Sequence, residues 1–202
     1  MPENTIFRDE RETFCPGPMA KMPDSVSEAK PSRGFVHVYT GNGKGKTTAA
    51  LGLCLRAVGA GFHVYIAQFM KSGTYSEVTA LKRLGGQVTL EQYGTGRFVR
   101  GNPSDEDRRI ARQGLDAAHR AVTSGHFQMV ILDESMVALH QGLLSVAQIE
   151  ALIDACPAAV ELVLTGRHAA PEIIAKADVV TDMREVKHYY QKGLTARTGI
   201  EK

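Results

Sequence analysis

Short apolar runs alternate with segments of helical periodicity from Gly34 onward. Several of the runs are continuously apolar, as is typical of strands that are covered on both faces of a sheet. The predicted strands are residues 35–40, 62–69, 87–92, 127–133, 159–165 and 178–182, and the predicted helices are residues 47–59, 75–84, 104–124, 135–141, 146–155 and 171–177. This alternation predicts a single α/β domain with a mostly parallel sheet and helices on both faces.

Two of these helices begin with a capping sequence. Ser104 is followed three residues later by Asp107, and Ser145 is followed by Gln148. In a capping box of this kind, the two side chains satisfy N–H groups that are unpaired at the start of a helix. We therefore expect helices to begin directly after Ser104 and Ser145.

Residues 1–33 differ in composition from the rest of the chain. They hold five of the eight prolines, together with many charged residues and little periodicity. A segment of this kind buries too little apolar surface to form a core of its own. We expect a flexible N-terminal arm over residues 1–33 and one folded domain over residues 34–202.

Composition excludes several classes of protein. The 202 residues are 43% hydrophobic and 23% charged, as in an ordinary globular domain. The formal net charge of +2 is too small to indicate nucleic-acid binding. The chain shows neither a signal peptide nor an apolar run of membrane-spanning length. We therefore expect a cytoplasmic protein that binds neither nucleic acid nor membrane.

The cysteines and histidines do not predict a metal centre. The three cysteines, at positions 15, 54 and 156, form no closely spaced pair, and no HExxH spacing occurs. Cys54 and Cys156 lie in apolar helical segments, so we expect them to be buried as small hydrophobic residues.

A glycine-rich loop follows the first predicted strand. Its residues are Gly41, Asn42, Gly43, Lys44, Gly45, Lys46, Thr47 and Thr48, and a helical segment follows. Glycines let backbone N–H groups turn toward one point, and the start of a helix adds unpaired N–H groups and a positive dipole end there. Lys46 adds a full positive charge, and the Thr47 hydroxyl is suited to Mg²⁺. The loop therefore predicts a site for a nucleotide polyphosphate.

The loop departs from the standard phosphate-loop pattern at one position. Thr40 occupies the place of the first glycine, which comes one residue later. The alternative interpretation is a glycine-rich turn with a surface lysine. That interpretation does not account for Lys44 and two threonines in the same loop, so phosphate binding is the stronger hypothesis.

Charged residues also follow two later strands. Asp133 and Glu134 come directly after an apolar strand, and Arg167 follows the next one. Because ligands of doubly wound sheets lie beyond the carboxyl ends of the strands, these acids are suited to Mg²⁺ and the arginine to a phosphate. Two alternatives are open: Asp133 caps the next helix, and Arg167 is a surface ion-pair partner.

Near the chain end, Lys187 and His188 either approach an anionic substrate or belong to a solvated surface.

Taken together, these motifs resemble those of the P-loop family of ATP:corrinoid adenosyltransferases. The resemblance rests on residues 40–48, Gln68-Phe69-Met70-Lys71, Ile131-Leu132-Asp133-Glu134, Thr165-Gly166-Arg167, residues 177–181, Lys187-His188 and Gly199-Ile200-Glu201. The displaced glycine is the form that this family uses. The resemblance implies a P-loop NTPase-like (RecA-like) fold. It also implies transfer of the 5′-deoxyadenosyl group of ATP to the Co(I) of cobalamin or cobyrinic acid a,c-diamide, with release of triphosphate.

The resemblance further implies roles for individual residues. Lys46 and Arg167 would be catalytic, and ATP would be bound by residues 41–48, Arg56 and Arg167. Mg²⁺ or Mn²⁺ would bind to Thr47 and Glu134, with Asp133 as a further candidate ligand. ATP would lie in the orientation opposite to that in most P-loop enzymes. A reductase that supplies Co(I) and a homodimer would be the protein partners.

The chain departs from the family where the corrinoid is expected to bind. Many relatives carry a Gly-Phe-Thr-Trp segment after the third strand, whereas this chain contains no tryptophan and has residues 94–100 there. Phe98 is the candidate replacement, and Lys187 and His188 are the other candidate corrinoid contacts. In some relatives an N-terminal helix covers the partner's site. Residues 1–33 would either do the same or form a disordered leader.

Two other functions use the same loop. A small-molecule kinase or NTPase would release ADP, and a non-catalytic ATP sensor or corrinoid carrier would release nothing. No Asn-Lys-x-Asp sequence favours a GTPase, and no Asp-x-His-x-x-Gly sequence favours a corrinoid carrier.

Overall fold

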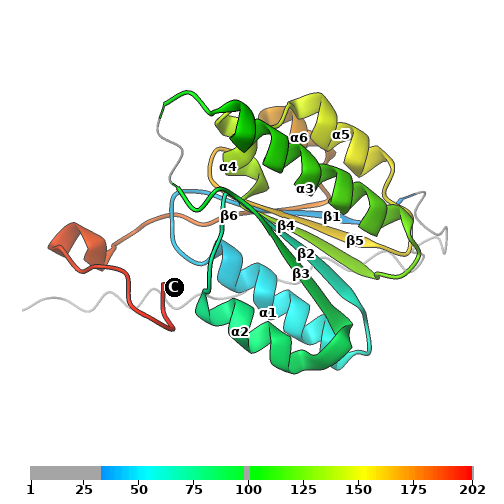
Figure 1. Ribbon diagram of the computed structural model, residues 1–202, viewed down its shortest axis with the longest axis horizontal. Helices are drawn as coiled ribbons and strands as arrows, with labels where there is room; N and C mark the ends of the chain where they lie inside the picture. The colour runs from blue at the N-terminus through cyan, green and yellow to red at the C-terminus, as the bar shows by residue number, and fades with distance from the viewer. Residues whose placement is uncertain (1–32, 98–100, 202) are drawn as a thin grey trace, which may run out of the picture. The chain divides into compact units, whose positions relative to one another are not determined.

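The computed structural model describes residues 33–97 and 101–201. Six strands form one sheet in the order β3-β2-β4-β5-β1-β6 (Figure 1). Their bounds are β1 (Val36–Thr40), β2 (Val64–Phe69), β3 (Val88–Tyr93), β4 (Met129–Asp133), β5 (Glu161–Thr165) and β6 (Val179–Asp182). All neighbouring strands are parallel. The predicted fold class is confirmed, and the sheet is wholly parallel.

Helices cover both faces of the sheet (Figure 1). They are α1 (Lys46–Gly59), α2 (Ser76–Leu81), α3 (Asp105–Thr123), α4 (Ser135–His140), α5 (Val146–Asp154) and α6 (Pro171–Lys176). Helices α1 and α2 pack on one face, and α3 to α6 pack on the other. The central strands β2 and β4 are buried along their whole length, which explains why their sequences are apolar except for Gln68 and Asp133 near their carboxyl ends.

The predicted elements all occur, with small shifts at their ends. Both capping boxes are present: Asp107 N donates to Ser104 Oγ, and Gln148 N donates to Ser145 Oγ. Two 3₁₀ helices, η1 (Lys82–Gln87) and η2 (Tyr189–Lys192), were not predicted. Helix α2 ends at Leu81, earlier than predicted, because the chain continues into η1, where Gly85 has a left-handed φ of 72°.

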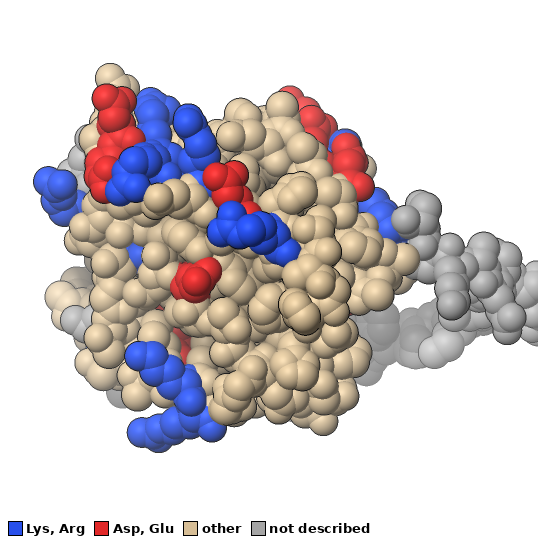
Figure 2. All heavy atoms as spheres, turned by 45° about the vertical axis from the view of Figure 1, so that its right-hand side comes forward, with Lys and Arg blue, Asp and Glu red and all other residues tan. Residues whose placement is uncertain are grey.

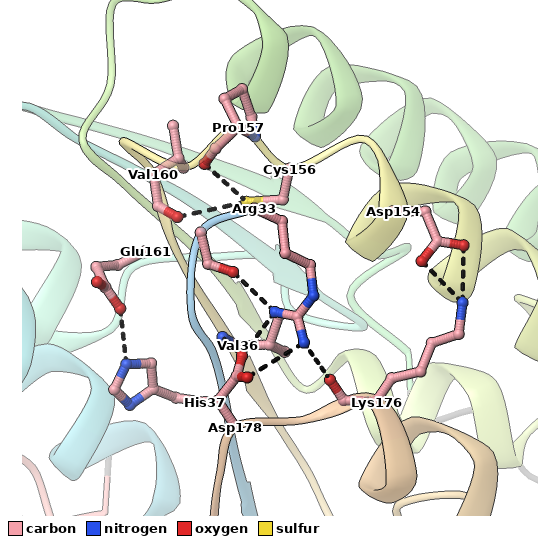
Figure 3. Close-up of polar contacts among 11 residues, drawn as sticks. Arg33, Val36, His37, Asp154, Cys156, Pro157, Val160, Glu161, Lys176 and Asp178 are labelled. Atoms are coloured by element: carbon pink, nitrogen blue, oxygen red, sulfur yellow. Dashed lines mark hydrogen bonds and ion pairs between the residues drawn. The ribbon is translucent and has the colours of Figure 1, made fainter. Parts of the chain in front are cut away.

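A polar cluster fixes the amino-terminal edge of the sheet (Figure 3). The Arg33 guanidinium donates to both carboxylate oxygens of Asp178, at 2.6 and 3.2 Å, and to the carbonyl oxygen of Lys176 at 2.9 Å. The Asp178 carboxylate also accepts from the backbone N–H of Val36 at 2.8 Å. This cluster therefore joins the start of β1 to the start of β6.

Several features of the described surface bear on the expected localisation and partners. On the face shown in Figure 2, lysines and arginines lie in small groups beside acidic side chains, with a wide uncharged area between them. None of the helices within residues 33–97 and 101–201 combines the length and apolar character needed to cross a bilayer.

Cys54 and Cys156 are buried as expected, and burial raises the pKa of both thiols to about 11. Most of the predicted arm, residues 1–32, lies outside the described residues.

The carboxylate of Asp178 should contribute stability that depends on pH. Its hydrogen bond with Arg33 lowers its pKa below the ordinary value of 3.8. A lowered carboxylate pKa stabilises the folded state above the ordinary value, and this contribution is lost as the pH falls through the lowered one. Because the pair is partly exposed, Asp178→Asn should reduce the free energy of unfolding near neutral pH by roughly 1 kcal/mol.

Urea unfolding at successively lower pH would measure this contribution. The difference between the wild-type protein and Asp178→Asn should shrink as the medium becomes acidic. Asp116→Asn, at an exposed position of α3, is the matched control and should have little effect. A difference that stays constant down to strongly acidic pH would show that the carboxylate charge does not contribute.

Candidate active site

A cavity of about 620 Å³ lies at the carboxyl end of the sheet. The glycine-rich loop and the start of α1 form one wall, and α2 and the segment before it form another. The residues that follow β4 and β5 and the last residues of the chain complete the cavity. Its lining residues are Gly43, Lys44, Gly45, Lys46, Thr47, Thr48, Leu51, Lys71, Ser76, Glu77, Ala80, Glu134, Arg167, His188, Gly199, Ile200 and Glu201.

The loop adopts a conformation that is suited to phosphate binding. Gly45 has a left-handed φ of 117°, and α1 begins at the next residue, Lys46. The Lys46 ammonium donates to the carbonyl oxygens of Gly41 and Gly43, both at 2.7 Å. Burial lowers the pKa of Lys46, and the nearby Arg167 lowers it further. The ammonium thus lies in the curve of the loop, beside the unpaired N–H groups at the start of α1.

The chain that follows β6 determines where this loop needs glycines. A Cβ atom on Gly41 would lie 2.3 Å from Asp182 Oδ1, and one on Gly43 would lie 2.7 Å from the carbonyl oxygen of Met183. The Gly43 N–H also donates to that carbonyl at 2.6 Å. Gly43 is therefore required by close packing and Gly45 by its φ angle, whereas Gly41 is required by both, because its own φ is 93°.

Asp133 lies at the centre of the polar groups behind the cavity. Its side chain is 1% exposed. Oδ1 accepts from the hydroxyls of Thr47 and Thr165, both at 2.8 Å, and Oδ2 accepts from Lys71 Nζ at 2.8 Å and Gln68 Nε2 at 3.2 Å. Four donors therefore satisfy this buried carboxylate. Because the Thr47 hydroxyl gives its proton to Asp133, its remaining lone pairs are free for a ligand.

These contacts follow from the register of the sheet. Gln68 on β2 lies directly opposite Gln92 on β3 and opposite Asp133 on β4. Gln92 Nε2 donates to Gln68 Oε1 at 3.0 Å, and Gln68 in turn donates to Asp133. Thr165, the last residue of β5, continues this polar row on the far side of Asp133. The row crosses four neighbouring strands near their carboxyl ends.

Glu134 is directed into the cavity by an uncommon backbone conformation. It has a left-handed φ of 61°, and its N–H donates to the Thr165 hydroxyl at 3.0 Å. Its carboxylate accepts no hydrogen bond from the residues that the structure describes. Burial raises the pKa of Glu134, and the neighbouring charge of Asp133 raises it further. Such a carboxylate is well suited to receive a cation.

The structure brings most of the predicted site residues together. The cavity is lined by residues 43–48, Glu134, Arg167 and His188. Lys44 additionally donates to the carbonyl oxygen of Ile200 at 3.2 Å. Gly41 contributes its carbonyl to Lys46, as described above. Asn42 is exposed and does not line the cavity, and neither does the exposed Lys187.

Arg56 does not lie with the other predicted ATP contacts. It is in the last turn of α1 and lines a second cavity of about 630 Å³. Because an α-helix rises about 1.5 Å per residue, that turn is far from the loop. Arg56 therefore does not line the cavity at the loop, and its predicted contact with ATP stays a prediction. Phe98, the predicted corrinoid contact, lies outside the described residues.

The sequence reasoning assigned no role to several residues of the site. Lys71 and Gln68 belong to a motif used for the resemblance, yet neither was predicted to line or support the cavity. The rule that acidic and basic residues at the carboxyl end of a strand face the ligand would have found Lys71, which follows β2. Residues 199–201 likewise belong to a motif used for the resemblance but were given no role, and no sequence signal indicated that Glu77 would reach the same cavity.

The fold and this cavity define a P-loop type of nucleotide-binding α/β domain. The family model described as ATP:corrinoid adenosyltransferase BtuR/CobO/CobP matches residues 32–201. The chain therefore belongs to the ATP:corrinoid adenosyltransferase family, and the resemblance drawn from the motifs is confirmed.

Individual relatives agree with this assignment. A corrinoid adenosyltransferase of Pseudomonas aeruginosa is 33% identical over 183 residues, which cover 90% of this chain and 90% of the relative. One from Escherichia coli K12 is also 33% identical, over 90% of this chain and 92% of the relative. The corrinoid adenosyltransferase CobA of Salmonella typhimurium is 33% identical over 87% of this chain and 89% of the relative.

Close packing at Gly43 yields a prediction about the loop. Gly43→Ala would force the chain after β6 to move, so we expect a loss of roughly 1–3 kcal/mol in stability together with weaker ATP binding. Gly52→Ala is the matched control, because a Cβ atom there meets nothing within 4 Å. In the middle of α1, this change should stabilise the protein by about 0.4–1 kcal/mol. Thermal unfolding and calorimetric ATP titration would measure both effects, and wild-type behaviour of Gly43→Ala would contradict the packing argument.

Proposed function

We propose that this protein transfers the 5′-deoxyadenosyl group of ATP to the Co(I) of a corrinoid, such as cobalamin or cobyrinic acid a,c-diamide, and releases triphosphate. Membership of the adenosyltransferase family supports this reaction. The observation that carries it is the phosphate-loop cavity, which is lined by Lys44, Lys46, Lys71 and Arg167. Four cations around one cavity suit a ligand with several negative charges.

The transfer is a displacement at carbon. The electron pair of Co(I) forms the cobalt–carbon bond at C5′, and the electrons of the C5′–O bond leave with the triphosphate. The cobalt is thereby formally oxidised to Co(III). The corrinoid supplies the nucleophile, so the site needs no general base. The protein must hold C5′ in line with cobalt and neutralise charge on the departing triphosphate.

The residues of the cavity are suited to that second task. The N–H groups at the start of α1 and the ammonium of Lys46 face the loop, where phosphate would bind. Arg167 lines the same cavity, and its guanidinium neither forms an ion pair with nor donates a hydrogen bond to any of the described residues. We propose Lys46 and Arg167 as the catalytic cations, and residues 43–48 as the main phosphate contacts.

The site also offers oxygen ligands for Mg²⁺ or Mn²⁺. The Thr47 hydroxyl and the Glu134 carboxylate both line the cavity. No group of three potential His, Cys, Asp or Glu ligands occurs within the described residues, and Mg²⁺ needs none, since it keeps several waters and binds through one or two protein ligands and phosphates. When bound, the metal would offset charge on the phosphates. Asp133 would hold Thr47 in place.

The proposed reaction also involves partner proteins and residues that contact the corrinoid. The reaction consumes Co(I), so a reductase must supply the reduced corrinoid. By likeness to the family we further propose a homodimer, in which residues 1–33 are the segment to test for a contribution to the partner's site. His188 lines the cavity and is proposed as a corrinoid contact, together with Phe98 and Lys187. We propose a cytoplasmic location.

One anaerobic experiment tests the reaction. The protein would be mixed with Mg²⁺, ATP and chemically reduced cobalamin, and separately with reduced cobyrinic acid a,c-diamide. Inorganic triphosphate in amounts equal to the light-sensitive cobalt–carbon product would support the proposal. Release of ADP instead would identify a kinase or NTPase, and ATP binding without any product would identify a sensor.

Lys46→Ala tests the phosphate assignment directly. Loss of a charged contact to the leaving group should lower kcat on the order of 100- to 1,000-fold. The rate of cobalt–carbon bond formation under anaerobic conditions is the measurement. Lys82→Ala, at an exposed position after α2, is the control and should retain full activity. Turnover by Lys46→Ala near the wild-type rate would contradict the assignment.

A further inference from the structure

Lys71 lines the same cavity as Lys46 and Arg167, but it is not among the catalytic cations or main phosphate contacts named above. It lies just beyond the carboxyl end of β2, so its backbone reaches the cavity from a different strand than the other two cations. Its side chain is 17% exposed. A lysine buried to this degree is uncommon unless it is paired.

The partners of Lys71 keep it positively charged. Nζ donates to Asp133 Oδ2 at 2.8 Å and lies 3.7 Å from Glu77 Oε1. Burial by itself would lower the pKa of Lys71, but the charge and hydrogen bond of Asp133 outweigh that effect, so the pKa is raised. An ammonium group has three donors. The bond to Asp133 uses one of them, which leaves donors for a ligand in the cavity.

The backbone around Lys71 is held firmly. Met70, directly before it, has a left-handed φ of 57°, which is uncommon for a residue with a side chain. The Met70 N–H donates to the carbonyl of Tyr93 at 2.9 Å. A Cβ atom on Gly94 would lie 2.7 Å from the Lys71 nitrogen, so the two segments are in close contact. Strained backbone that is fixed in this way concentrates at functional sites.

The polar row across the sheet fixes the same loop from a second side. Gly73 N donates to Gln92 Oε1 at 3.0 Å, and Gln92 connects through Gln68 to Asp133. Asp133 in turn binds both Lys71 and Thr47. The loop that carries Lys71 is therefore tied to the phosphate loop through hydrogen bonds that meet at the buried carboxylate of Asp133.

We propose that Lys71 is a further catalytic cation that contacts the triphosphate of ATP. This inference rests on the proposed function. Its ammonium group binds phosphate oxygens in the bound substrate and stabilises the negative charge that the triphosphate gains as the C5′–O bond breaks. Asp133 positions Lys71 and Thr47 together, so that both face the same phosphates.

Binding of inorganic tripolyphosphate tests this contact without any corrinoid. Lys71→Gln keeps an amide donor near Asp133 but removes the charge. It should weaken tripolyphosphate binding, measured by titration calorimetry, by about 10- to 100-fold, the usual effect of losing one charge-assisted hydrogen bond. Lys71→Arg should restore most of the affinity. Lys82→Gln, at the exposed control position, should bind as the wild-type protein does.

Adenosine is the second probe, because a purely structural role would affect both ligands. Under the proposal, Lys71→Gln binds adenosine as the wild-type protein does. Unchanged tripolyphosphate affinity would overturn the proposal, and so would an equal loss for both ligands. If the wild-type protein transfers no adenosyl group while Lys71 still governs tripolyphosphate binding, the proposed function fails and the contact stands.

A measurement on the wild-type protein covers the case in which Lys71→Gln does not fold. Limited acetylation with acetic anhydride, followed by mass spectrometry, reports the reactivity of each lysine. Tripolyphosphate should protect Lys71 and leave Lys82 unprotected. Equal modification of Lys71 with and without tripolyphosphate would overturn the proposal.

Discussion

The buried carboxylate of Asp133 is the constraint on which the arrangement of the site depends. A carboxylate that is 1% exposed is costly unless donors surround it. Here the donors come from the start of α1, from β2 and the segment after it, and from the end of β5. To satisfy this one charge, the chain must bring these elements to a common point. That point is the back of the cavity in which we propose that phosphate binds.

The parallel sheet makes this convergence possible. All six strands run in the same direction, so their carboxyl ends meet at one edge of the sheet. Near the ends of three of these strands, non-glycine residues take left-handed backbone conformations: Met70 directly after β2, Glu134 directly after β4, and His168 three residues after β5. Each lies next to a charged residue of the site, or is itself one. Sharp changes of direction at the strand ends therefore place acids and cations around the cavity, and the buried hydrogen bonds below them hold that geometry in place.

The site balances charge as well as shape. Lys46, Lys71 and Arg167 lie near Asp133, Glu134 and Glu77, and the pKa shifts follow from this proximity. Burial and Arg167 lower the pKa of Lys46, while Asp133 keeps Lys71 charged. Burial and Asp133 raise the pKa of Glu134. A polyphosphate accompanied by a divalent cation would match this mixture of groups. The phosphates would meet the lysines and the arginine, and the divalent cation would meet the carboxylates.

The sequence by itself determined the strands, the helices, both capping boxes, the phosphate loop and the acids and arginine at the strand ends. These follow from local periodicity and from motifs that are contiguous in the chain. Tertiary structure decided the rest. The pairing of Gln68 with Gln92 and Asp133 depends on strand register, which no single segment specifies. The position of Lys71 depends on the left-handed turn at Met70. The crowding at Gly43 is caused by the chain after β6. The distance between Arg56 and the loop is set by the direction of α1. Contacts between distant segments become visible only when the strands are placed side by side.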